Sequence, residues 1–157
     1  MTLGCNERWD VLRLIEQVRL RFGVSNFFIW GRSMGAVAGI KFYQLLSQEQ
    51  SAGRCQDIVV LGLVLDSAFI SLKRMVVEVT QSRVSIPGLL VKAVFMMVSS
   101  SIEKRAGFKV EQLELAEDVK AIRCSTLLVT SKEDSFVNYS HSEEIFSKLK
   151  LHDSKEI

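Results

Sequence analysis

The sequence has few cysteines and few histidines, and they form no cluster. Its three cysteines, Cys5, Cys55 and Cys124, lie far apart without a Cys-x-x-Cys pair, and there are only two histidines, His141 and His152. Neither a disulfide framework nor a zinc site is predicted from this pattern. We therefore expect a reducing, cytoplasmic setting, with no metal and no other cofactor.

An excess of one charge and a long hydrophobic run are also lacking. The 157 residues include 20 Lys and Arg against 18 Asp and Glu, scattered along the chain, which argues against a nucleic-acid-binding protein. The longest apolar stretch, 86–98, contains Pro87 and Lys92 and is shorter than the roughly 20 residues that cross a bilayer. We expect no transmembrane segment and, from residues 1–10, no secretory signal.

What is present is enough apolar residues for a core, 48% of the chain, in alternating helical and strand patterns. The length fits one domain or part of one. Amphipathic helices are predicted over 7–22, 34–46 and 140–149, and continuous apolar strands over 27–30, 58–65 and 126–130. This alternation predicts an α/β fold whose parallel sheet carries helices on both faces.

The stretch between the second and third strands is longer than a simple crossover needs. Residues 71–80 and 87–101 read as helices, and 110–122 as a shorter amphipathic segment. We expect a helical lid inserted over 70–122, within an incomplete domain that occupies 1–157. Its apolar residues favour either a hydrophobic acyl substrate or ordinary packing, and membrane-surface contact through this lid is also open.

The pentapeptide Gly31-Arg32-Ser33-Met34-Gly35 fits the Gly-x-Ser-x-Gly pattern, with a buried strand before it and a helix after it. A serine nucleophile must sit on a sharp turn, and flanking glycines make room for the crowded backbone. The amide of Met34 would then point at a developing oxyanion. This context predicts a nucleophile elbow at Ser33.

A serine nucleophile needs a base and an acid that orients the base. Asp134 lies just past the third strand and follows the serine in the chain order expected of such enzymes. Asp66, the competing acid, is more simply explained as a local partner of the following loop with Ser67. His141 is a weak prospect for the base, because it begins a helix only seven residues after Asp134.

Five segments together resemble the α/β-hydrolase superfamily, in particular its intracellular serine-aminopeptidase-like, prolyl-oligopeptidase-related branch. They are Leu3-Gly4-Cys5-Asn6-Glu7, residues 30–37, Leu65-Asp66-Ser67-Ala68-Phe69, residues 104–108 and Glu133-Asp134-Ser135-Phe136-Val137. The resemblance implies Ser33 as nucleophile, Asp134 as acid and Met34 as an oxyanion donor. It also implies earlier strands with a His-Gly-type loop and a later Gly-x-His segment, so the chain looks like the middle of a hydrolase, truncated at both ends.

The sequence thus predicts a serine hydrolase core that acts on an ester, thioester or amide of a small-molecule or peptide substrate. Its base would be a histidine beyond this chain. Two alternatives stay open: a truncated or pseudoenzyme scaffold without catalysis, and a phosphate-binding βαβ module that uses Arg32 and the helix after Gly31. Dinucleotide binding would need Gly-x-Gly-x-x-Gly and an acidic residue about 20 positions further on, and neither is in place.

Overall fold

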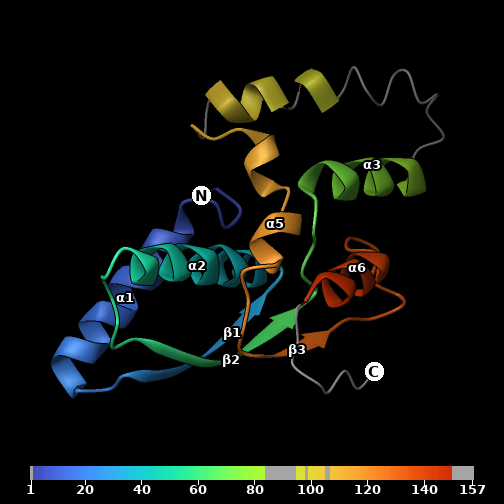
Figure 1. Ribbon diagram of the computed structural model, residues 1–157. Coiled ribbons are helices and arrows are strands. Elements are labelled where there is room, and N and C mark those ends of the chain that lie inside the picture. Colours follow the sequence, from blue (N-terminus) through green and yellow to red (C-terminus); the bar gives the residue numbers. More distant parts are fainter. Residues whose placement is uncertain (1, 84–94, 98, 105–106, 150–157) are drawn as a thin grey trace.

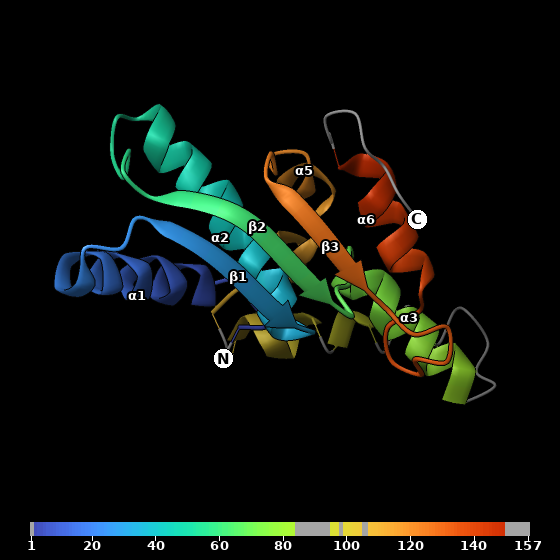
Figure 2. The ribbon, with the colours of Figure 1, turned by 90° about the horizontal axis from the view of Figure 1, so that it is seen from below.

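The computed structural model describes residues 2–83, 95–97, 99–104 and 107–149. Three strands, β1 (Asn26–Arg32), β2 (Val59–Asp66) and β3 (Ser125–Val129), form a parallel sheet in the order β1-β2-β3. Their arrowheads point the same way in Figure 2. The predicted α/β class and the parallel sheet are confirmed, and each predicted strand overlaps the observed one.

The register brings the carboxyl ends of the strands to one level. Arg32, the last residue of β1, lies opposite Asp66, the last residue of β2, and Asp66 lies opposite Val129, the last residue of β3. The loops that leave the three strands therefore begin side by side. In open parallel sheets this edge is where ligands bind.

The helices on either side of β1 begin and end close to where the sequence predicts. Helix α1 (Glu7–Phe22) ends at Gly23, whose φ of 68° is favourable for glycine and whose amide donates to the Arg19 carbonyl at 2.8 Å. Helix α2 (Met34–Ser51) begins directly after Ser33 and runs one turn beyond the predicted helix. Both helices lie above the sheet in Figure 1.

The long connection from β2 to β3 is helical in its described parts. Helix α3 (Leu72–Arg83) comes first, and the short helices η1 (Val110–Leu113) and α5 (Ala116–Val119) come last. Residues 95–97 and 99–104 are also helical, whereas 84–94 of the predicted lid lie outside the described residues. Helix α6 (Ser140–Lys148) follows β3, as predicted.

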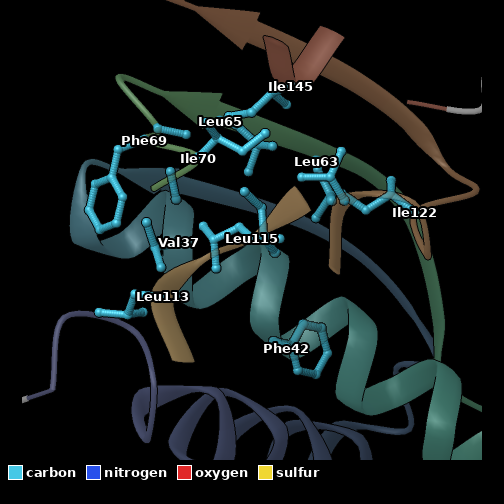
Figure 3. Close-up of a cluster of buried hydrophobic side chains, with 14 of the residues drawn as sticks. Val37, Phe42, Leu63, Leu65, Phe69, Ile70, Leu113, Leu115, Ile122 and Ile145 are labelled. Carbon is cyan, nitrogen blue, oxygen red and sulfur yellow. The ribbon is translucent and has the colours of Figure 1, made fainter. Parts of the chain in front are cut away.

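The core fills the space between the sheet and the helices that cover it, as Figure 3 shows. It is built by β2, α2, α6 and the returning segment that contains η1 and α5. Its labelled side chains in Figure 3 are Val37, Phe42, Leu63, Leu65, Phe69, Ile70, Leu113, Leu115, Ile122 and Ile145. Burial of this set is the main force that holds the end of the long connection against α2 and β2.

One ion pair lies inside this packing. Lys41 Nζ of α2 is 2.7 Å from Asp118 Oδ2 of α5, and both side chains are only 8% exposed. A buried charge is costly unless it is paired, so each residue requires the other. The pair fixes where the returning segment meets α2.

The face of the sheet opposite these helices departs from the prediction. Figures 1 and 2 show the helices gathered on one side, and Phe28 and Trp30 on the other side are 74% and 78% exposed. Leu61 of β2 and Leu127 of β3 are exposed there too. Helices on both faces were expected, but within the described residues only one face is covered. The apolar pattern of the strands is present, and no described element packs against it.

Candidate active site

Ser33 occupies a strained turn between β1 and α2. Its φ of 50° and ψ of −114° lie outside the regions that residues with a Cβ normally adopt, and such a conformation costs about 1–3 kcal/mol. The Ser33 amide donates to the Asp66 carbonyl at 2.7 Å, which holds the turn against the end of β2. Ser33 is exposed. The predicted order of strand, sharp turn and helix is therefore present at Ser33, and its role as a nucleophile stays a prediction.

The two glycines of the motif serve unequal purposes. A Cβ on Gly31 would overlap the Gly35 carbonyl group and come within 2.6 Å of the Ala36 amide nitrogen. At Gly35 a Cβ would meet no atom within 4 Å beyond the neighbouring residues and the backbone of its own helix. The turn therefore requires a residue without a Cβ at position 31. The sequence predicts this requirement for both Gly31 and Gly35.

Met34 contributes its backbone to the site. It is the first residue of α2, and the Ser33 carbonyl accepts from the amides of Ala36 and Val37 at 3.0 and 3.1 Å. The amides of Met34 and Gly35 precede these, and the first amides of a helix have no carbonyl partner within it. They lie beside Ser33 at the positive end of the helix, where an anionic oxygen is stabilised.

Asp134 is held in the loop after β3 by its own backbone. Its Oδ1 accepts from the amides of Phe136 at 2.8 Å and Val137 at 3.0 Å. Burial alone would raise the pKa of Asp134, but these two amides, the Ser67 hydroxyl and the charge of Arg32 together lower the pKa below its usual range. The carboxylate is thus ionised and fixed through one oxygen.

Arg32 and Ser67 both contact Asp66, the last residue of β2. Arg32, which is next to Ser33 in the chain, places Nε 3.6 Å from Asp66 Oδ2 with its side chain 81% exposed. The Ser67 hydroxyl donates to Asp66 Oδ1 at 3.2 Å. This last contact is the local role expected for Asp66. The sequence did not indicate that Ser67 and Arg32 would also help to lower the pKa of Asp134.

His141 is fully buried at the start of α6, and both ring nitrogens have neighbours. Nδ1 accepts from the Ile70 amide at 3.3 Å, so the proton of the neutral ring lies on Nε2, 3.2 Å from Glu78 Oε2. Burial is the main cause that lowers the pKa of His141. Arg74 also lowers it, while Glu78 and Glu144 oppose that shift.

The position of His141 bears on its predicted role as the base. A general base needs a nitrogen within reach of the Ser33 hydroxyl. His141 is fully buried, with Nδ1 accepting from the Ile70 amide and Nε2 near Glu78 but without a hydrogen-bond partner, whereas Ser33 is exposed at the sheet edge. The burial of His141 does not favour this role, which stays a prediction. His152 lies outside the described residues.

A cavity of about 290 Å³ lies next to Asp134, between α3 and the loop after β3. Glu78, Val79 and Ser82 line it from the α3 side, and residues 134–136 and 138 line it from the loop. Nowhere in the described part of the chain do three or more His, Cys, Asp or Glu side chains gather as metal ligands would. The side chains here suit proton transfer and hydrogen bonding.

Comparison with solved structures identifies the architecture. The chain aligns over its whole length with an esterase of Pyrococcus furiosus, Pf2001, with a TM-score of 0.61 and 16% sequence identity. The fold is therefore similar to that of this esterase. This chain spans 56% of the length of that esterase chain. No family model and no curated protein matches the sequence.

The described residues include no helix that could cross a membrane. Of the helices in 2–83, 95–97, 99–104 and 107–149, none is both long enough and apolar enough to pass through a bilayer.

Proposed function

We propose that this chain is the core of a serine hydrolase of the α/β-hydrolase type, with Ser33 as nucleophile. The observation that carries the proposal is the exposed, strained Ser33 at the junction of β1 and α2, beside the unpaired first amides of that helix. Backbone strain of this kind persists where a function needs it. The likeness in fold to an esterase agrees with this chemistry.

In the proposed reaction, Ser33 Oγ attacks the carbonyl carbon of an ester, thioester or amide while a histidine takes the hydroxyl proton. The carbonyl oxygen becomes an oxyanion that accepts from the Met34 amide. The leaving alcohol, thiol or amine then departs with the proton that the histidine returns. Water attacks the acyl-serine through the same base, which releases the acid and restores Ser33. Asp134 orients and stabilises the histidine throughout.

The base in this proposal is a histidine beyond the described residues, in a Gly-x-His segment that follows β3 and α6. Two observations support that choice. His141, the single histidine among the described residues, is fully buried, whereas Ser33 is exposed. In addition, the chain corresponds to 56% of the esterase with which it aligns, so that esterase is longer than the part matched here.

We further propose that 1–157 is part of one hydrolase domain with a lid over 70–122, in the serine-aminopeptidase-like branch and in the cytoplasm. The substrate would carry an apolar acyl group. Met96 and Met97, on a helical part of the proposed lid, are exposed and offer an apolar surface to such a group or to a membrane surface. Lids and pockets, rather than the fold itself, determine the substrate in such proteins.

A scaffold without catalysis is the second candidate, favoured by the complete burial of His141, the histidine of the described residues. Phosphate binding is less well supported, because Arg32 lies 3.6 Å from the carboxylate of Asp66, which offsets the charge that would attract a phosphate.

Hydrolysis of p-nitrophenyl esters of increasing acyl length by the protein as its gene encodes it tests the proposal. We expect turnover that Ser33→Ala abolishes and that longer acyl chains improve, while Arg32→Ala leaves a folded enzyme. A folded protein with no Ser33-dependent turnover of any ester, thioester or peptide amide would support the scaffold instead. Saturable phosphate binding weakened by Arg32→Ala would support the phosphate module.

A further inference from the structure

The long connection from β2 to β3 begins and ends in two short segments that are paired with each other. The Leu115 amide donates to the Ile70 carbonyl at 2.8 Å, and Ser71 and Glu114 form an antiparallel bridge. The Ser71 hydroxyl also donates to Glu114 Oε1 at 2.7 Å. These four residues form a short stem, and residues 72–113 are joined to the rest of the chain through it.

A side chain from another element binds the backbone of this stem. His141, at the start of α6, accepts from the Ile70 amide through Nδ1 at 3.3 Å. His141 is fully buried and Ile70 is only 3% exposed, so bulk water does not compete for this bond. A buried amide needs an acceptor. The bond therefore ties the stem to α6.

This bond requires a neutral imidazole ring. A second proton would go to Nδ1, which then becomes a donor and faces the Ile70 N–H, so that the hydrogen bond is lost. On the other side of the ring, Nε2 lies 3.2 Å from Glu78 Oε2, and in the described part of the chain neither atom has a hydrogen-bond partner. The charged ring is therefore attracted to Glu78 and no longer accepts from the stem.

The charged groups around His141 come from α3 and α6. Burial is the main cause that lowers the pKa of His141; Glu78 raises it, Arg74 lowers it and Glu144 raises it. The other elements packed against α6 are β3, which has no charged residue, and α5. The acids of α5 are paired, Glu117 with Lys120 and Asp118 with Lys41. The ring is therefore neutral near pH 7 and takes up a proton in acid.

We propose that His141 is a pH-dependent anchor for the long connection: its neutral ring holds the stem to α6, and protonation of Nδ1 releases the stem. The released stem keeps its internal bonds, so Ile70 and Leu115 leave α6 together. Because α3 begins two residues after Ile70 and lines the cavity beside Asp134, release also shifts α3 at that cavity. The inference does not depend on the proposed function.

Hydrogen exchange of backbone amides, followed by NMR on the full chain, tests the anchor. The protection factor of each amide is measured at pH values of about 7.5 and 5.5, on either side of an ordinary histidine pKa. We expect the protection of Ile70 and Leu115 to fall by up to about tenfold at the lower pH, since the released state binds a proton more readily. The control is the Val59 amide, which donates to the Ser25 carbonyl at the opposite end of β2 and should keep its protection.

His141→Asn separates the acceptor from the titration. Asparagine offers Oδ1 as an acceptor for the Ile70 amide but has no proton to gain over this pH range. We expect the protection of Ile70 in this variant to be the same at both pH values. His141→Leu, which has no acceptor, should show low protection of Ile70 at both.

Three results would overturn the proposal. The first is equal protection of Ile70 at the two pH values in the wild type, or the same fall in His141→Asn. The second is a fall at Ile70 without one at Leu115, which would mean that the bond breaks while the stem stays in place. The third is an equal fall at Val59, which would mean that the whole domain unfolds. If His141→Asn does not fold, the three amides of the wild type still decide.

Discussion

Ser33 and Asp66 are joined across the sheet edge, because the Ser33 amide donates to the Asp66 carbonyl at 2.7 Å. The contact continues the pairing of Arg32 with Asp66 one residue past the end of β1. Ser67 is joined to Val129 in the same way at 2.8 Å. The strained turn at Ser33 is therefore supported by β2, and the next turn by β3, so that the loops of the site are tied to the rigid sheet.

Gly31 and Gly35 are expected to respond oppositely to alanine. Gly31→Ala forces a Cβ into the backbone of Gly35 and Ala36 and should lower the free energy of unfolding by about 1–3 kcal/mol. Gly35→Ala places a Cβ in open space on a helix, where alanine is favoured over glycine by up to about 1 kcal/mol. Urea denaturation measures both. Greater destabilisation by Gly35→Ala than by Gly31→Ala would contradict the description of the turn.

Replacing Asp134 and Asp66 by asparagine is expected to affect different properties, activity in the first case and stability in the second. Asp134→Asn removes the charge that orients the base, a loss of about 10⁴ in kcat for a serine triad. Asp66→Asn removes an exposed pairing with Arg32 and should cost about 1 kcal/mol or less in stability, with activity largely kept. Esterase kinetics and urea denaturation of both variants make the comparison. Equal losses of kcat in two folded variants would mean that Asp134 is not the acid.

His141 makes stability depend on pH. Burial lowers its pKa in the folded chain, so the unfolded chain binds more protons in mild acid. Its contribution is therefore complete above the unfolded pKa of about 6.5 and falls as the pH drops through that value toward the folded pKa.

The measurement is the free energy of unfolding at pH values of about 7.5 and 5.5, on either side of that unfolded pKa. The difference should be smaller in His141→Gln than in the wild type, while Asp134→Asn, with a carboxyl that titrates at lower pH, should keep the wild-type difference. If the free energy of unfolding differs between the two pH values by as much in His141→Gln as in the wild type, the pH dependence comes from another group.

The buried pair of Lys41 and Asp118 supports a prediction about the core. Lys41→Met leaves Asp118 as an unpaired buried charge and should cost about 3–5 kcal/mol. The double variant Lys41→Met with Asp118→Leu removes both charges and should recover most of that loss. Thermal and urea unfolding measure the cycle. A double variant as unstable as Lys41→Met alone would show that the unpaired charge of Asp118 is not the cause of the loss.

Much of the fold was predictable because its signals are local. The helical periodicity that stops at Gly23, the apolar run before Gly31 and the helix after Ser33 each depend on a few neighbouring residues. These three signals together predict a strand, a turn and a helix, and the structure has them in that order. The strained conformation of Ser33 follows from the same short segment.

The rest depends on contacts between distant residues. His141 receives its hydrogen bond from Ile70, 71 positions earlier, and no local pattern indicates that contact. The bond from the Ser67 amide to the Val129 carbonyl follows from strand order and register, which bring the ends of β2 and β3 together. Likewise, apolar residues such as Phe28 and Trp30 predict that their face of the sheet is covered, but they do not indicate which element covers it. Both side chains are exposed in the structure.

The central claim, that Ser33 is a nucleophile, is tested most directly by a fluorophosphonate probe followed by peptide mass spectrometry. Applied to the protein as its gene encodes it, the probe should add one phosphonyl group, located on Ser33. Ser33→Ala should prevent the addition, Asp134→Asn should slow it, and Ser51→Ala should leave it unchanged. A folded wild-type protein that stays unmodified at Ser33, or that carries the adduct on another residue, would contradict the claim.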